Sequence, residues 1–256
     1  MLAALEFPTI DEIVRFRPVI GTFDDPIFLN KIGIISILAV VATLILFIGG
    51  GRGKLVPSGL QNVAEMGVDF IREGIIKETM GKDGMGWMPY LTTLFFFIFF
   101  CNLTEIIPVF QMPATARMGI PLVLALLTWI LFIITGFVKQ GPSYIKSALV
   151  PPGVPVALLP LMVLIEFIST FLVRPFSLAV RLFANTLAGH ILLVTFAVLT
   201  ETLFLADSLA LKPIAIFPFL MLVLMTGFEL MVAFLQAYIF VLLTAVYIGG
   251  AMHPEH

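Results

Sequence analysis

Charged residues are scarce in this sequence. Asp, Glu, Lys and Arg make up only 12% of its 256 residues, about half of the ~25% that soluble globular domains carry. Hydrophobic residues make up 60%, and the mean hydropathy is +1.12. Such a chain has too few charges to cover a surface that faces water, which excludes an ordinary soluble protein. The composition predicts a polytopic membrane protein.

Cysteine and the common catalytic motifs are also scarce or absent. The single cysteine, Cys101, excludes disulfides within the chain and gives no metal cluster. No glycine-rich loop that would cradle a phosphate is present, and no pair of a nucleophile and a base stands out. We therefore expect no metal site, no cofactor and no catalytic residue. A net charge of −2 gives no indication of a nucleic-acid partner.

Three apolar runs have the length of ordinary membrane spans, since about 20 helical residues cross the ~30 Å hydrocarbon core. They cover residues 32–50, 90–108 and 120–138, and each is bounded by Gly, Pro or charged residues. The last two runs are expected to pair as a helical hairpin over residues 89–138.

Residues 57–82 mix charged and apolar positions. Ser58 and Gln61 have the spacing of a capping box after Pro57. Charged residues then recur at helical spacing, opposite an apolar face: Glu65, Asp69, Arg72, Glu73 and Lys77 against Val63, Met66, Phe70 and Ile71. The pattern predicts an amphipathic helix along the cytoplasmic membrane surface. A helical loop that merely covers its neighbours would give the same pattern.

The second half of the chain contains two unusually long apolar stretches, residues 156–205 and 214–248, with no polar loop inside either one. A helix of about 45 residues exceeds ~60 Å, about twice the thickness of the hydrocarbon core. The options are a kink or a tilt beyond the ~20° average. We predict two long, tilted helices packed as a hairpin over residues 155–250 and joined near residues 207–208 and 212–213. The expected fold is all-α, one membrane domain over residues 1–256.

Basic residues in short loops predict the orientation. The loop after the first span holds five basic residues and the loop after the third holds two, whereas the loop after the second holds only Arg117. Arg15, Arg17 and Lys31 in the N-terminal segment weaken this contrast, although that segment also holds five acidic residues. By the positive-inside rule, the first and third loops and the C-terminus are cytoplasmic, and the N-terminal segment, residues 1–31, is outside. The acidic and proline-containing start, MLAALEFPTIDEIVRFRP, does not resemble a cleaved signal peptide.

The stretch RLFANTLAGH, residues 181–190, places an arginine, an asparagine and a histidine inside an apolar run. An arginine at the bilayer centre costs ~3 kcal/mol on insertion scales and more than ~10 kcal/mol in simulations, so it usually serves a pathway or a partner. Helical spacing puts one set of residues on a single stripe: Arg174, Ser177, Arg181, Ala184, Asn185 and Ala188. No carboxylate shares the stripe, so a counter-charge could come from another polypeptide. A static ion pair with Glu166 or Glu229 is the alternative.

A second set of polar residues lies off this stripe. His190 faces away from Arg181, and Glu229 and Gln236 share a face of the last long helix because they are seven positions apart. Antiparallel packing would bring His190 towards Glu229, and Asn185 and Gln236 nearer the arginine. A His–Glu pair at this depth fits a proton relay, and it fits a structural hydrogen bond equally well.

Other polar residues are less informative. Asn102 and Glu105, with Thr104, sit near the outer end of the second span, where they could line a water-filled passage or meet lipid headgroups.

RPFSLAVRLFANTLAGH, followed downstream by ELMVAFLQAYIFVLLTAVY, resembles the signature of subunit a of F-type ATP synthases. The similarity extends over most of the chain, including PSGLQN, the Asn-containing second span and FVLLT. Matched by motif, Arg181 corresponds to the family's essential arginine, Asn185 to the polar residue one turn later, and Gln236 to the glutamine of the last helix. His190 and Glu229 resemble an exchanged form of the acid–histidine pair that many bacterial relatives carry.

The resemblance also shows one departure. Glu166 stands fifteen positions before Arg181, where relatives often have an acid fourteen before, and a bulge or a changed register would account for the difference. Glu166 and Ser177 are therefore expected as possible lining residues of a half-channel, together with Asn102 and Glu105.

The resemblance implies a function and a set of partners. A proton-translocating stator subunit would have two offset half-channels that serve the carboxylates of a rotating ring of c subunits, with Arg181 between the channels. Its partners would be the c ring, the b subunits of the peripheral stalk, the rest of the complex and lipid, in a bacterial plasma membrane. A secondary transporter or a stand-alone ion channel is the alternative, although neither an internal repeat nor a matched pair of broken helices is evident.

Overall fold

The fold is helical, apart from one short strand pair, throughout the part of the chain that the structure describes. The computed structural model describes residues 18–20, 29–51, 58–107, 113–150, 155, 158–206, 208 and 211–252. Strands β1 (Pro18–Ile20) and β2 (Leu29–Asn30) pair antiparallel just before the first long helix. The predicted all-α class is confirmed, with this small pair as an unpredicted addition. Most of the expected N-terminal segment, and Pro57, lie outside the described residues.

Three helices have the length of ordinary spans, as predicted. They are α2 (Lys31–Gly50), α5 (Met88–Leu103), which follows the 3-10 helix η2 (Gly81–Trp87), and α6 (Gly119–Gln140). Helix α5 ends five residues before the predicted boundary at 108. Its end is turned by local bonds, because the Thr104 hydroxyl donates to the Cys101 carbonyl and the Glu105 amide to the Asn102 carbonyl. The chain then returns through the 3-10 helix η3 (Ala114–Ala116) to α6.

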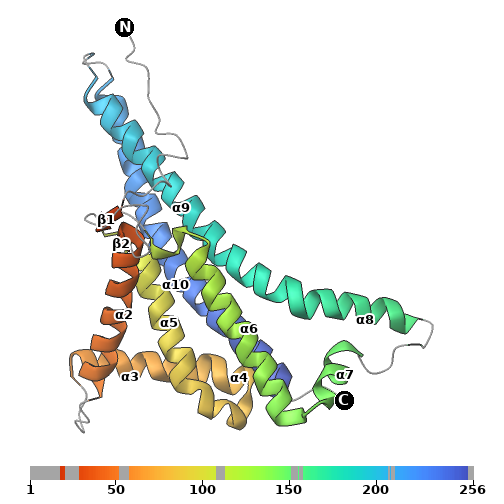
Figure 1. Ribbon diagram of the computed structural model, residues 1–256. Coiled ribbons are helices and arrows are strands. Elements are labelled where there is room, and N and C mark those ends of the chain that lie inside the picture. Colours follow the sequence, from red (N-terminus) through yellow and green to blue (C-terminus); the bar gives the residue numbers. More distant parts are fainter. Residues whose placement is uncertain are drawn as a thin grey trace.

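The amphipathic segment crosses the spans at a steep angle (Figure 1). It comprises α3 (Leu60–Ile71), the π-helical turn η1 (Arg72–Ile76) and α4 (Lys77–Thr79). The predicted capping box is wrong. Gly59, at φ 61°, occupies the N-cap position, and the Gln61 amide donates forward to Glu65 at 2.8 Å. Glycine adopts this positive φ at little cost, so no side-chain cap is needed to start the turn.

This segment is fastened closely to the spans. The Phe96 ring of α5 occupies the space that a β-carbon at Gly67 would need, and the Ala64 β-carbon fills the corresponding space at Gly50, the last residue of α2. Ile71 and Ile75 are fully buried beneath it. On the other side, an exposed ion-pair chain links Asp69, Arg72, Glu73 and Lys77. The Lys77 hydrogen bond lowers the pKa of the Glu73 carboxyl.

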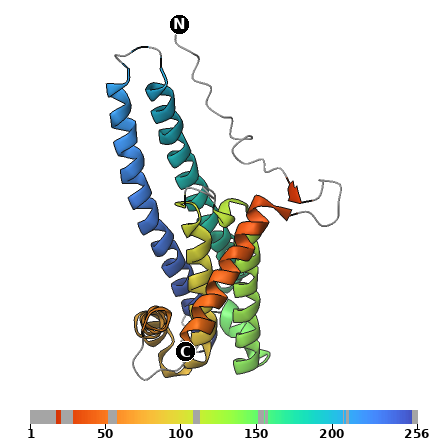
Figure 2. The same cartoon turned by 90° about the vertical axis from the view of Figure 1, so that its left-hand side faces the viewer.

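Two very long helices complete the fold and lie side by side in both views (Figures 1 and 2). The first is continuous over 46 residues through α8 (Leu159–Ile168), the π-helical turn η5 (Ser169–Val173) and α9 (Arg174–Phe204). The second spans 40 residues through η6 (Pro213–Ala215) and α10 (Ile216–Met252). The predicted pair of long, inclined helices is confirmed. The connection between Phe204 and Pro213 falls where it was expected, although Asp207 lies outside the described residues.

The π turn η5 explains how a long helix passes a proline. In a π turn each N–H bonds the carbonyl five residues back, as Arg174 N–H does with Ser169. The carbonyl of Thr170 would then need the N–H of residue 175, which is a proline and has none. The indole of Trp129, on α6, donates to that carbonyl at 3.3 Å. The break in the helical ladder is therefore satisfied by a neighbouring helix, and α8 and α9 meet at a visible bend (Figure 1).

Small and aromatic residues fill the contacts of α10. Buried alanines at positions 179, 233, 237 and 245 allow α9, α10 and α5 to approach closely. Next to them, the rings of Phe95 and Phe99 from α5 meet Phe234 of α10 edge to face. The phenylalanine run of the second span therefore contributes to the core. Many side chains on the outer faces of α2, α6, α8 and α10 are exposed and apolar, as expected of helices that meet lipid.

Candidate functional site on the long helix pair

The stripe that begins at Arg174 is presented on the outside of α9. Arg181, Ala184, Asn185 and Ala188 are exposed, whereas Leu182, on the opposite side, is fully buried against the other helices. Among the described residues, Arg181 forms neither an ion pair nor a hydrogen bond. The alternative of a static ion pair with Glu166 or Glu229 is therefore not what the structure has. The guanidinium lies among small side chains on an otherwise apolar face.

One turn away, Asn185 connects the stripe to α10. Its side-chain amide donates to the Gln236 Oε1 atom at 2.7 Å. Gln236 is only 3% exposed, and its Nε2 group has no hydrogen-bond partner in the structure. A buried amide N–H without an acceptor is costly, so this atom is well placed to donate to a water molecule or an incoming group. Asn185 and Gln236 are therefore joined directly, one helical turn after Arg181 on α9.

His190 and Glu229 come close together without forming a direct pair. Both are buried, with exposed fractions of 7% and 5%, on facing sides of α9 and α10. The Glu229 carboxylate packs onto the backbone of Gly189, in the space that a β-carbon there would occupy. In the described structure no hydrogen bond or ion pair joins Glu229 to His190. The carboxylate therefore lies against Gly189, the residue that precedes His190 in the chain.

Glu105 brings a second buried carboxyl to this region. It is 4% exposed, and its Oε1 atom has no partner in the described structure. Burial, and secondarily the negative charge of Glu229, raise the pKa of the Glu105 carboxyl to about 9. The influence of Glu229 places the two acids in one electrostatic neighbourhood, although they are 124 positions apart in the chain. At neutral pH Glu105 is therefore mostly protonated and is able to donate a hydrogen bond.

Two threonines complete a polar bridge that sequence reasoning missed. The Thr115 hydroxyl donates to Asn102 Oδ1 at 2.7 Å and lies 3.1 Å from the Thr186 hydroxyl of α9. Thr186 stands one turn before His190 on the same buried side. Threonines that bond their own helix are common in this chain, as at Thr135 and Thr195, so nothing in the sequence distinguished Thr115 and Thr186. The bridge ties Asn102 and the turn after α5 to α9.

Glu166 and Ser177 lie on the other side of Arg181. Glu166 is half-buried on α8, before the π turn, and Ser177 is half-buried on the stripe itself. A π turn accommodates one additional residue in a helix. The fifteen positions between Glu166 and Arg181 therefore turn through nearly the same rotation as fourteen would in an uninterrupted α-helix. Of the two explanations offered by the sequence, a bulge or a changed register, the structure has a bulge, at η5.

The C-terminal end of the pair is held by a different group of residues, again unpredicted. Gln140, the last residue of α6, donates to the Ala251 carbonyl at 2.8 Å and accepts from the Ser147 hydroxyl at 2.6 Å. The Ala251 carbonyl belongs to the last turn of α10, where no helical N–H is available to it. Close by, the guanidinium of Arg174 lies over the Tyr247 ring, 5.2 Å from its centroid.

No group of three metal-binding side chains occurs among the described residues. What the structure brings together is instead a set of ionisable and amide groups along the contact of two long helices, beside an exposed and unpaired arginine. This arrangement, with the long apolar helices, defines the chain as a polytopic membrane protein with buried polar groups in its helix contacts.

Sequence comparisons identify the family. A profile of the ATP synthase A chain matches residues 33–249, which is most of the chain. The chain is 44% identical to ATP synthase subunit a of Rhodococcus erythropolis, over 99% of this chain and 94% of that protein. It is 42% identical to the subunit a of Frankia alni over 90% and 80% of the two chains, and 44% identical to that of Rhodopseudomonas palustris over 86% of each. The chain belongs to the ATP synthase A chain family.

Proposed function

We propose that this chain is the proton-translocating stator subunit of an F-type ATP synthase, with Arg181 between two half-channels that serve the carboxylates of a rotating c ring. The observation that carries the proposal is the exposed guanidinium of Arg181, which has no counter-charge among the described residues. A fixed cation on an apolar face needs a partner that brings negative charge. A ring carboxylate passing along the stripe meets this requirement.

Arginine suits this position because it stays protonated in proteins. Its charge favours the ionised form of a carboxylate that faces it, and so promotes proton release to one side. The same charge repels a proton that would cross directly from one half-channel to the other. The small residues Ala184 and Ala188 beside it leave room for the close approach of a partner helix.

The outer half-channel in this proposal passes the buried polar groups of the helix contact. Glu105, His190 and Glu229 lie on the side of the pair towards the connection between α9 and α10, and the polar chain continues through Gln236 and Asn185 towards Arg181. The unpartnered Glu105 Oε1 and Gln236 Nε2 atoms support the presence of water along this route. Protons would reach the ring past Glu229 and His190, with Asn102 as a lining residue.

The inner half-channel runs past Glu166 and Ser177 to the opposite surface. Both residues are half-buried and lie before Arg181 on the first long helix, which separates them from the outer route by the arginine. Each proton that falls through 100 mV yields only about 2.3 kcal/mol. Several protons must therefore be combined through rotation to make one ATP. In this proposal the chain carries the protons, and ATP is made elsewhere in the complex.

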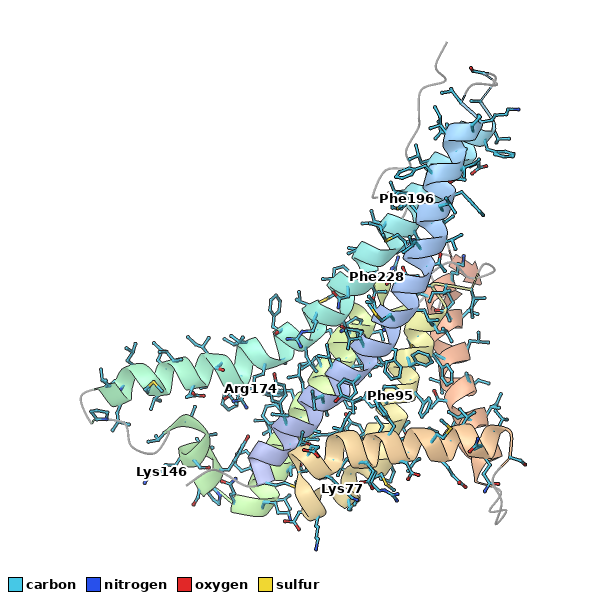
Figure 3. All side chains as sticks on the ribbon, turned by 180° about the vertical axis from the view of Figure 1, so that it is seen from behind. Lys77, Phe95, Lys146, Arg174, Phe196 and Phe228 are labelled. Carbon is cyan, nitrogen blue, oxygen red and sulfur yellow. The ribbon has the colours of Figure 1, made fainter. Side chains whose placement is uncertain are left out.

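Partners and orientation follow from the same proposal. The chain would bind the c ring through the Arg181 stripe, and the peripheral-stalk b subunits and lipid elsewhere. Lys77 and Lys146 lie at the same end of the molecule (Figure 3), which supports a cytoplasmic position of that end by the positive-inside rule. The chain would then be a multi-pass protein of the bacterial plasma membrane, with the N-terminus outside and the C-terminus in the cytoplasm.

Purification of the tagged chain from mild detergent, followed by ATP-driven proton pumping in vesicles, tests the proposal. We expect a ring of small carboxylate-bearing subunits to co-purify, and Arg181→Ala to abolish coupled pumping while the complex still assembles. Normal pumping by Arg181→Ala, or solute transport by the purified chain alone, would contradict the proposal and favour a secondary transporter.

A further inference from the structure

Two arginines share the exposed stripe of α9 but have different surroundings. Arg174 and Arg181 are seven positions apart, so their side chains leave the helix within about 20° of the same direction. Arg181 is exposed and unpaired among the described residues, whereas Arg174 is half-buried. The stripe therefore has two permanent positive charges, of which one is engaged within the chain.

The engagement of Arg174 comes from an aromatic pocket. Its guanidinium carbon lies 5.2 Å from the centroid of the Tyr247 ring on α10, a geometry in which the ring face attracts a cation. Tyr144, on α7 (Ser143–Leu149), lies nearby. Burial raises the pKa of its hydroxyl, and the positive charge of Arg174 opposes that rise. Phe132, on α6, also packs against the Tyr247 ring, with 6.0 Å between the ring centroids.

The inclination of the helix makes this engagement important. Arg174 lies at the start of α9, at the bend that follows α8 (Figures 1 and 3). At ~1.5 Å per residue, the two arginines are about 10 Å apart along the helix axis. Because α9 is inclined, a partner carboxylate that moves past the stripe would pass Arg174 and Arg181 at different points of its path. A free guanidinium at Arg174 would then present a second binding position for a passing carboxylate.

We propose that Tyr247 is a positioning residue that holds Arg174 away from the stripe, so that the moving carboxylate of the partner meets Arg181 alone. This inference rests on the proposed function. A carboxylate bound at Arg174 would be held at the wrong place on the stripe and would have to leave that cation before the next step. Loss of the Tyr247 ring therefore slows rotation, because the freed Arg174 binds the passing carboxylate. Removal of Arg174 as well eliminates this second binding position.

The test compares four variants of the intact complex in membrane vesicles: Tyr247→Leu, Tyr247→Phe, Arg174→Gln, and Tyr247→Leu combined with Arg174→Gln. We expect Tyr247→Leu to lower the initial rate of ATP-driven proton pumping about five- to tenfold. Tyr247→Phe retains an aromatic face and should pump at close to the wild-type rate. Arg174→Gln is the reference for the double variant, which should recover most of the lost rate and pump as fast as Arg174→Gln alone. The amount of assembled complex is measured for each variant.

Recovery in the double variant distinguishes this role from simple packing. If Tyr247 only filled space, Tyr247→Leu and the double variant would be equally slow, and the inference would be wrong. Normal pumping by Tyr247→Leu would also overturn it. Tyr247→Met, which fills more of the volume of the ring, is used in the same way if the leucine variant assembles poorly. Normal pumping by Arg181→Ala contradicts the proposed function itself. Loss of pumping in Arg181→Ala with normal pumping in Tyr247→Leu contradicts only this inference.

Discussion

The two ends of the α9–α10 contact differ in how completely their polar groups are bonded. In the half towards their connection, where residues 185–204 of α9 meet residues 216–236 of α10, Gln236 Nε2 has no hydrogen-bond partner among the described residues, and neither has Glu105 Oε1 beside this half. At the other end, next to the last turns of α10, Gln140 is hydrogen-bonded on both sides and Arg174 lies over the Tyr247 ring. Unsatisfied groups are costly, so a chain retains them where water or a partner is to bind. The first half therefore has free capacity for hydrogen bonds, and the end near Tyr247 is suited to holding the helices in place.

A carboxylate introduced next to Arg181 would give this arginine a partner within the chain, as Arg174 already has in Tyr247. Asn185→Asp places an acid one turn after the arginine, where i,i+4 pairing is favourable. We expect an internal ion pair at this low-dielectric position to lower the initial rate of ATP-driven pumping about a hundredfold or more. Asn185→Ser, which removes the amide without adding charge, is the matched control. Wild-type pumping by the aspartate variant would mean that the free charge of Arg181 is not required.

The close contact between Gly189 and Glu229 can be broken with one methyl group. In Gly189→Ala the β-carbon would collide with the Glu229 carboxylate, so the acid must leave its position against Gly189. We expect about a tenfold loss in the rate of proton pumping. Gly227→Ala is the control, since nothing lies within 4 Å of its β-carbon position. Equal rates for the two alanine variants would show that the position of Glu229 is not critical.

Glu105 makes the first half sensitive to pH. Its pKa of about 9 exceeds the ordinary value of 4.5, so the folded chain binds this proton more tightly than the unfolded chain does. Stability should therefore decrease as the pH rises from about 4.5 to about 9, and change no further from this group above that range. We expect Glu105→Gln to reduce the loss of thermal stability between pH 6 and pH 9 in the detergent-solubilised complex. An unchanged pH dependence would contradict the buried, protonated state.

Removal of the hydrogen bond at the η5 bend should have the smallest effect of these changes. Trp129→Phe removes the indole donor to the Thr170 carbonyl and leaves that carbonyl without its partner. We expect a loss of about 1 kcal/mol in stability, seen as a lower thermal transition of the complex. The control is Trp87→Phe, which keeps the edge-to-face contact with Tyr90. If both variants lose the same stability, the hydrogen bond is not what stabilises the bend.

The long-range pattern of the sequence predicted the helices well. The apolar runs have lengths that correspond directly to single or double crossings of the hydrocarbon core, so α2, α6 and the two long helices were predictable. The ends of the helices were less predictable. The second span stops at Leu103 because a hydroxyl and an amide bond back onto its last carbonyls, a choice that hydropathy does not record. The capping box failed for a similar reason, since the backbone of Gly59 started the helix instead.

The candidate site was predictable only where periodicity determines it. Helical spacing placed Arg181, Asn185 and Ala188 on one exposed stripe, and the structure has them there. Contacts between distant segments could not be read in this way. The pairing of Thr115 with Thr186, and of Arg174 with Tyr247, depends on how three or four helices pack, which no single-helix pattern contains. The π turn was anticipated only as a register difference before Arg181.

The fastening of the amphipathic segment to the spans has a consequence for the height of the whole site. A ring of α5 seated on Gly67, and a methyl group seated on Gly50, leave α3 little freedom to rise or sink independently of the helices it crosses. If α3 floats at the boundary between lipid and water, that boundary sets the depth of every span with it. The depth of Arg181 in the membrane, and so its height relative to the proposed partner carboxylate, would then be set by a helix that does not contact it.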